Sequence, residues 1–140
     1  MKEEVKEEAE KIRTRVIVDV VRHAREAAPT ECCGLLLGDE GGVGEAVRTG
    51  NVSADPSRFV IDPADHIARR REARERGLAV LGFYHSHPRS AAIPSATDRE
   101  EAAYPGHLYL IVGLATDPPD LGLYQFDAGN FRRVRFVTVD

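Results

Sequence analysis

Apolar residues recur along the chain at two different spacings, one typical of helices and one typical of strands. Helical spacing predicts a helix over residues 15–28 with Thr14 as its cap, although the β-branched run 16–18 also allows a strand in its first half. Further helices are predicted over residues 63–77, where a proline opens the segment, and over residues 96–104. The pattern therefore predicts helices in the first, middle and later parts of the chain.

Short apolar or alternating runs bounded by glycine, proline or aspartate predict the strands. They cover residues 32–37, 45–52, 59–61, 79–87, 107–114, 121–126 and 131–139. The run 79–87 is mostly apolar, which is typical of a central strand, whereas alternation in 131–139 indicates a sheet with one solvated face. The order of elements predicts a mixed α/β (α+β) fold with a single mixed β-sheet flanked by helices.

The length of 140 residues predicts one domain, which we place at residues 12–140, after a charged extension over residues 1–11. The first residues have no apolar stretch of a secretory signal, and no apolar run is long enough for a membrane span. We therefore expect a cytoplasmic protein with no membrane partner. A net charge of −4 argues against nucleic acid as the main partner, because phosphate neutralisation requires a basic surface.

The two cysteines are neighbours in the sequence, at Cys32 and Cys33. Adjacent Cα atoms lie about 3.8 Å apart, which is below the usual disulfide range of roughly 4.4–6.8 Å. We therefore expect both to be reduced, small and buried, with a metal-binding role as the alternative.

The chemistry of the chain is concentrated where the apolar run 79–87 ends. The sequence His85-Ser86-His87-Pro88 is followed at fixed distance by Ser95 and Asp98. Alternate residues of a strand point to the same face, so both imidazoles leave the sheet together. Asp98, in the first turn of the next helix, can face them. Three ligands of this kind, with a fourth position open for water, are typical of a catalytic zinc site.

Each half of this pattern also has an ordinary structural explanation. A His-x-His pair can be two polar residues on an exposed strand face, and Ser95 with Asp98 forms a favourable helix N-cap pair. Capping is compatible with catalysis, because a fixed helix start would hold both side chains in place. Together the two halves predict a hydrolytic metal site with His85, His87 and Asp98 as ligands.

A metal-dependent hydrolase also needs a general base that takes a proton from water and returns it to the leaving amine. Glu31 is the best candidate, because it directly precedes a predicted buried strand, where burying a carboxylate that has no function is energetically unfavourable. A solvated loop acid is the alternative explanation for this residue.

These segments resemble the JAMM (MPN+) metalloprotease family over roughly residues 12–138. The resemblance is carried by Pro29-x-Glu31-x-Cys33-Gly34-Leu35-Leu36-Leu37-Gly38, His85-Ser86-His87-Pro88 and Pro94-Ser95-x-x-Asp98. It implies a cytidine-deaminase-like isopeptidase fold with Zn²⁺ held by His85, His87 and Asp98. It also implies that Glu31 is the catalytic acid/base and that Ser95 stabilises the tetrahedral intermediate.

The resemblance further implies a substrate class. Small stand-alone members similar to this chain act on the C-terminal tails of ubiquitin-like sulfur-carrier proteins. They either trim residues after the terminal Gly-Gly or release cysteine from a carrier adduct. No insertion is present that could grip ubiquitin itself, so the expected substrate is the tail of a sulfur carrier.

Two other interpretations remain open from the sequence. The first is a non-catalytic protein-binding module on the same fold. The second is a structural Cys₂His₂ zinc site built from Cys32, Cys33, His85 and His87, although adjacent cysteines point to opposite faces of a strand.

Overall fold

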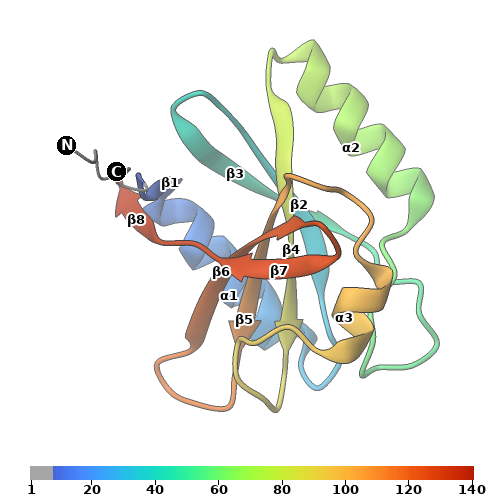
Figure 1. Ribbon diagram of the computed structural model, residues 1–140. Coiled ribbons are helices and arrows are strands. Elements are labelled where there is room, and N and C mark those ends of the chain that lie inside the picture. The colour runs from blue at the N-terminus through green and yellow to red at the C-terminus, as the bar shows by residue number, and fades with distance from the viewer. Residues whose placement is uncertain (1–7) are drawn as a thin grey trace.

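The computed structural model describes residues 8–140, whose strands form one sheet in the order β7-β6-β5-β4-β2-β3-β1-β8 (Figure 1). The strands are β1 (Glu10–Arg13), β2 (Cys33–Asp39), β3 (Gly42–Thr49), β4 (Ala79–His87), β5 (Leu108–Gly113), β6 (Asp120–Asp127), β7 (Asn130–Arg133) and β8 (Phe136–Val139). The helices are α1 (Thr14–Ala27), α2 (Pro63–Glu75) and α3 (Ala96–Glu101). The predicted single mixed sheet with flanking helices is confirmed.

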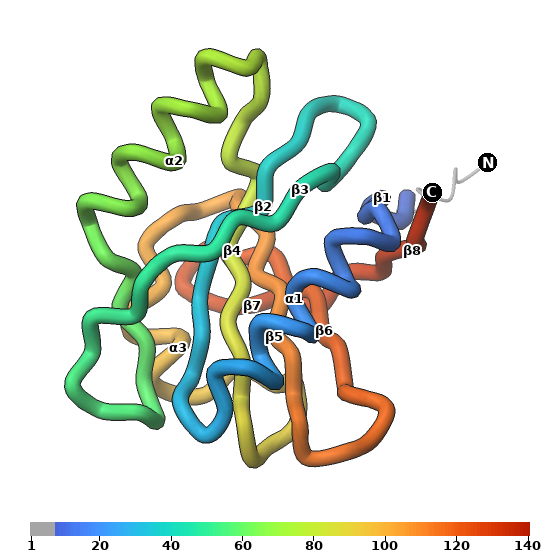
Figure 2. Tube along the Cα trace, turned by 180° about the vertical axis from the view of Figure 1, so that it is seen from behind, coloured from blue at the N-terminus to red at the C-terminus, as the bar shows by residue number. Residues whose placement is uncertain are grey.

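Strand β4 lies in the interior of this sheet, as its apolar run predicts. It pairs antiparallel with β2 on one side and parallel with β5 on the other. Helix α1 crosses one face of the sheet, the face turned toward the viewer in Figure 2, while α2 and α3 lie on the opposite face. Both faces of β4 are therefore covered, which explains why nearly all its residues are buried.

Alternation along the strands divides the core into two layers. Tyr84 and Leu36 face α1 and pack with its apolar stripe of Val16, Val20 and Ala24. Their neighbours face α2, where the second layer gathers Leu35, Leu37, Ala73, Val80, Phe83, Ala92, Tyr109, Ile111, Tyr124 and Phe126. The alternation continues through the next residues of β4, so that His85 and His87 lie on the face covered by α2 and α3.

The sheet curls until its two edges come close together. The predicted strand 131–139 is in fact two strands, β7 and β8, which lie at opposite ends of the strand order although only two residues separate them. Such a short connection brings the two edges close together, because the three Cα–Cα steps from Arg133 to Phe136 span at most about 11 Å. Alternation of side chains continues through this bend, which is why the pattern predicted one strand.

Other boundaries differ for local reasons. Residues 59–61 are not a strand, since only Ile61 forms an isolated bridge, with Asn51, and α3 is shorter than predicted. Thr14 is the first helical residue of α1, and its hydroxyl contacts the main chain of Val139 instead of capping the helix.

The charged segment at residues 1–11 is described only from residue 8 onward. Its last two residues belong to β1, which pairs in parallel with β8. Ile12 is the buried member of this strand and anchors it to the core. No helix within residues 8–140 is long and apolar enough to cross a membrane.

Candidate metal centre

The end of β4 places two imidazoles side by side in a buried position. His85 is 2% exposed and His87 is 6% exposed, and their Nε2 atoms lie 3.2 Å apart. Ser86, between them, points to the opposite face, where its Oγ accepts a hydrogen bond from the main chain of Cys32 at 2.9 Å. This confirms that the strand directs both histidines to one face and supports a structural role for Ser86.

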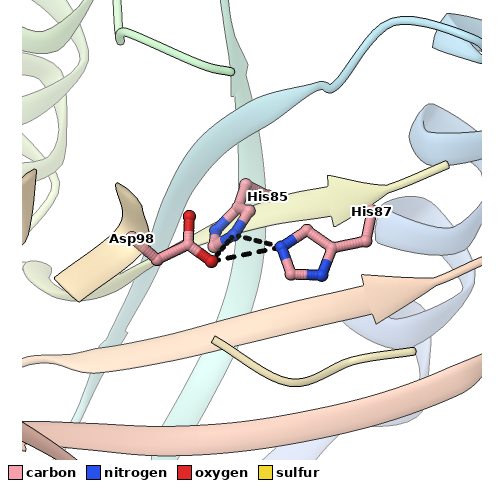
Figure 3. A group of neighbouring side chains, drawn as sticks. All are labelled: His85, His87 and Asp98. Carbon is pink, nitrogen blue, oxygen red and sulfur yellow. Dashed lines mark hydrogen bonds and ion pairs between the residues drawn. The ribbon is translucent and has the colours of Figure 1, made fainter. Parts of the chain in front are cut away.

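Helix α3 brings the carboxylate to the same point. Ser95 is its N-cap, with Oγ accepting a hydrogen bond from the N–H of Asp98 at 3.0 Å. In return, Asp98 Oδ2 accepts from the N–H of Ser95 at 2.9 Å, which completes a capping box. The same Oδ2 atom lies 3.1 Å from Nε2 of both histidines (Figure 3). Capping therefore fixes the carboxylate against the imidazoles, as expected from the sequence.

These three atoms fit a tetrahedral metal ion. Their separations are 3.1, 3.1 and 3.2 Å, and a tetrahedral ion with bonds of about 2.0–2.1 Å separates its ligands by roughly 3.3 Å. Nδ1 of His87 donates to the carbonyl of Ala91 at 2.9 Å, so in the neutral ring Nε2 presents its lone pair to the other two atoms. A cation between the three atoms would satisfy them together.

The ring of His85 is oriented differently from that of His87. Phe59 stacks on it with ring centroids 4.4 Å apart. Its Nδ1 atom is buried without a hydrogen-bond partner among residues 8–140. Apolar packing therefore fixes this ring, whereas a backbone carbonyl fixes that of His87.

The electrostatics hold two members of the group, Asp98 and His85, in the charge state that a metal ion requires. Although burial opposes it, the hydrogen bonds from His85 and His87 hold the pKa of Asp98 well below its usual range, so this carboxylate is charged at neutral pH. Burial lowers the pKa of His85, which favours the neutral ring that a metal requires. The pKa of His87 is instead raised despite burial, because the protonated ring donates from Nε2 to Asp98, and a metal ion would have to displace that proton.

Glu31 lies on the same cavity as two members of this candidate metal-binding group. It lies two residues before β2, is 9% exposed, and lines a hollow of about 580 Å³ together with His87, Ser95 and Asp98. Burial is the main cause that raises the pKa of Glu31 to about 7, and the charge of Asp98 adds to it while His87 opposes it. Such a carboxyl group can both take and return a proton near neutral pH.

A second, smaller cavity adjoins the centre on its other side. It has a volume of about 180 Å³, and His85 and Asp98 lie in its wall beside Phe83 and Tyr104. Phe59 borders both cavities and therefore stands between them. The metal-binding group thus has a polar hollow on the side of Glu31 and an aromatic one on the other.

Both cysteines are free and buried, as expected. Sγ of Cys33 lies 3.4 Å from the hydroxyl of Thr49 and 3.6 Å from the carbonyl of Gly50. Within residues 8–140, the ligand-bearing side chains that converge on one point are His85, His87 and Asp98, with no cysteine among them. The alternative Cys₂His₂ site is therefore not formed, because the Cys33 thiol contacts Thr49 and Gly50 and Cys32 packs in the core layer beneath α1.

Several supporting residues were not identified from the sequence. A Cβ on Gly113 would lie 2.6 Å from Ala92 N and Ser90 O, so this glycine lets the loop after β4 pack onto β5. That close approach sets the position of the Ala91 carbonyl at His87. A glycine ending an apolar strand is the signal that could have indicated it. Phe59 carried no signal, since its contact with His85 crosses 26 residues.

Comparison with known proteins gives consistent relatives. A desampylase from Haloferax volcanii is 42% identical over 99 residues, which are 66% of this chain and 71% of that protein. A CysO-cysteine peptidase from Mycobacterium tuberculosis is 30% identical over 103 residues, 72% of this chain and 70% of that protein. A solution structure from Desulfitobacterium hafniense superposes with a TM-score of 0.84 at 28% identity, covering 93% of this chain and 92% of that one.

Residues 13–127 match the family described as prokaryotic homologs of the JAB domain. This range includes the metal-binding group, Glu31 and Ser95, and it omits only the ends of the chain. The resemblance noted from the sequence motifs is confirmed, and the chain belongs to this prokaryotic branch of the JAMM/MPN proteins.

Proposed function

We propose that this protein is a zinc metallopeptidase or isopeptidase that hydrolyses an amide bond at the C-terminal tail of a ubiquitin-like sulfur-carrier protein. The observation that carries the proposal is the convergence of His85, His87 and Asp98 at one point, beside a cavity that His87, Asp98 and the buried Glu31 line together. The relatives named as a desampylase and as a CysO-cysteine peptidase support the hydrolase class and the carrier tail as substrate.

His85, His87 and Asp98 would hold the ion through Nε2, Nε2 and Oδ2. Nitrogen and oxygen ligands in this number suit zinc, which leaves one position for exchangeable ligands. When bound, zinc polarises a carbonyl group and lowers the pKa of water to about 7. Ala91 and Phe59 keep the two rings in place while this chemistry proceeds.

Glu31 would move the protons of the reaction. Its carboxylate takes a proton from the attacking water and then returns it to the amine that leaves, so that the carboxylate is regenerated. A pKa of about 7 suits both steps, because the two protonation states are then close in energy. The leaving amine must therefore come within reach of Glu31, which places it in the larger cavity.

Ser95 would stabilise the developing oxyanion. Its Oγ accepts from the N–H of Asp98, so the hydroxyl hydrogen is free to donate to a substrate oxygen. Preorganised donors of this kind contribute about 3–4 kcal/mol to transition-state stabilisation.

The proposed function is tested by incubating the protein with Gly-Gly-tailed sulfur-carrier proteins. Some carry a C-terminal peptide, some a single C-terminal cysteine, and some an isopeptide-linked lysine. Mass spectrometry with and without chelator reads the products. Metal-dependent cleavage after Gly-Gly is expected, and the preferred leaving group separates peptide trimming, cysteine release and deconjugation. Stoichiometric zinc with no cleavage of any substrate would instead support a binding module.

Two substitutions at Ser95 should separate its capping role from its catalytic role. Ser95→Gly keeps a tolerated N-cap residue but has no side-chain donor, whereas Ser95→Thr keeps both the cap and the hydroxyl. We expect Ser95→Gly to lower kcat by about 10²-fold with little change in melting temperature, and Ser95→Thr to retain most activity. Steady-state kinetics and thermal unfolding measure the two effects. Equal activity in both variants would exclude the oxyanion role.

A further inference from the structure

The segment 51–60, which connects β3 to α2, touches the active centre at several points, and we call it the strap. Phe59 of the strap stacks on His85, and Arg58 forms an ion pair with Glu101 at the end of α3. The carbonyl of Pro56 accepts a hydrogen bond from the N–H of Glu31 at 3.0 Å. The strap therefore contacts a metal ligand, the helix of another ligand, and the main chain of the general base.

Asn51 is the hub that organises the strap. Its Nδ2 atom donates to the carbonyls of Glu31 and Arg58, both at 3.0 Å. Its Oδ1 atom accepts from the N–H groups of Ser53 and Val60, also both at 3.0 Å. The types of partner fix the orientation of the amide, because a flipped side chain would face oxygen with oxygen. Each of the two polar atoms of the Asn51 side chain therefore forms two hydrogen bonds.

These contacts hold the main chain of Glu31 from both sides. Its N–H is bound by Pro56 O and its carbonyl by Asn51 Nδ2, although the residue itself lies outside any strand. The following residue, Cys32, is bound to Ser86 of β4 through both its N–H and its carbonyl. The direction of the Glu31 side chain is therefore set by the strap on one side and by β4 on the other.

We propose that Asn51 is a positioning residue for Glu31, acting through the strap and not through contact with substrate. The proposal rests on the proposed function, in which Glu31 moves the protons. Loss of the Asn51 donors would release the Glu31 carbonyl and loosen the strap that binds the Glu31 N–H. A displacement of about 1 Å in a reacting group can lower a rate about 100-fold.

Three variants distinguish the effect of losing the Asn51 Nδ2 donor from the effect of weakening hydrogen bonds elsewhere in the strap. Asn51→Ala removes all four bonds. Asn51→Asp keeps the acceptor oxygen but turns a second oxygen toward the carbonyls of Glu31 and Arg58, so it removes only the donors. Ser53→Ala is the matched control, because its hydroxyl bonds only within the strap, to the main chain of Asp55.

We expect Asn51→Ala and Asn51→Asp to lower kcat by about 10- to 100-fold with KM changed less, and Ser53→Ala to stay near wild type. In a Glu31→Gln background, Asn51→Ala should have little further effect, because two residues that act as a unit are not additive. Equal losses in both backgrounds, full activity of Asn51→Asp, or an equal loss in Ser53→Ala would overturn the proposal.

A second readout does not depend on activity. Amide hydrogen exchange followed by NMR should show faster exchange of the Glu31 N–H in Asn51→Ala, with the amides of β2 and β4 unchanged. If the Glu31 N–H exchanges at the wild-type rate in Asn51→Ala, the positioning role is overturned, whatever the activity of that variant. Conversely, if wild-type protein cleaves no carrier while Glu31 exchange responds to Asn51, the proposed function fails and the structural link stands.

Discussion

Replacing Glu31 with glutamine is expected to lower kcat by about 10²- to 10⁴-fold while zinc stays bound. Glutamine has nearly the same shape as glutamate but cannot take a proton from water or return one to the leaving amine. The metal should remain because Glu31 is not among the three side chains that converge as ligands. Single-turnover cleavage of a carrier fusion and metal analysis of the purified variant measure the two quantities.

Glu100→Gln is a matched control, because it removes a carboxylate from the exposed surface of the same helix that carries Asp98. This variant should keep wild-type activity. Retained activity in Glu31→Gln would show that another group moves the protons. Loss of zinc in Glu31→Gln would show that this residue belongs to the ligand set.

Glu31→Gln is also expected to change the thermal stability of the metal-free protein. Burial raises the pKa of Glu31 from 4.5 to about 7. Between these values the folded state binds more protons than the unfolded state, so this group makes stability fall as pH rises. Glu31→Gln removes that effect. The variant should therefore unfold at higher temperature than wild type above pH 7 in the presence of chelator, and the difference should vanish toward pH 4.5.

Removing the metal, or one of its ligands, is expected to abolish hydrolysis and lower thermal stability together. Asp98→Asn keeps an oxygen that can accept the Ser95 N–H but removes the negative charge that the ion requires. At a zinc concentration 100 times Kd, binding stabilises the fold by about 2.7 kcal/mol, which corresponds to roughly 5–10 °C in Tm for a domain of this size. We expect that shift in wild type and none in Asp98→Asn.

Thermal unfolding with zinc, with chelator and after zinc is added back measures this shift. Chelated wild type and Asp98→Asn should then behave alike toward substrate. Zinc affinity should also weaken at acidic pH, because Asp98 raises the pKa of His87 and a protonated imidazole cannot bind a metal. A zinc-dependent Tm shift in Asp98→Asn would contradict the assigned ligand set. So would wild-type activity that survives chelation.

Most of the strands and the local placement of the candidate ligands follow from local sequence rules. Strand alternation is enough to direct His85 and His87 to one face, and N-capping is enough to fix Ser95 relative to Asp98. These local rules do not by themselves bring the histidine pair of β4 and the Ser95–Asp98 pair of α3 together in space. The loop between them is placed by the close approach of Ala92 to Gly113, which depends on the pairing of β4 with β5.

The supporting residues were harder to predict because they act through the main chain. The Ala91 carbonyl holds His87, and the Pro56 carbonyl holds the Glu31 N–H. A backbone carbonyl is present at every position, so nothing in the sequence distinguishes these two. Asn51 lies 20 residues from Glu31, and its role depends on a turn that local periodicity does not describe.

The end of strand β4 directs successive residues to opposite sides of the sheet, with Tyr84 bound to His23 under α1 while His85 and His87 face Asp98. A single inserted or deleted residue within this stretch would exchange the two sides, burying both imidazoles beneath α1 and turning a phenol and a hydroxyl toward Asp98. A change of length between Tyr84 and His87 would therefore separate the imidazoles from Asp98, whereas an added residue in the turn between β2 and β3 leaves the alternation of β4 intact.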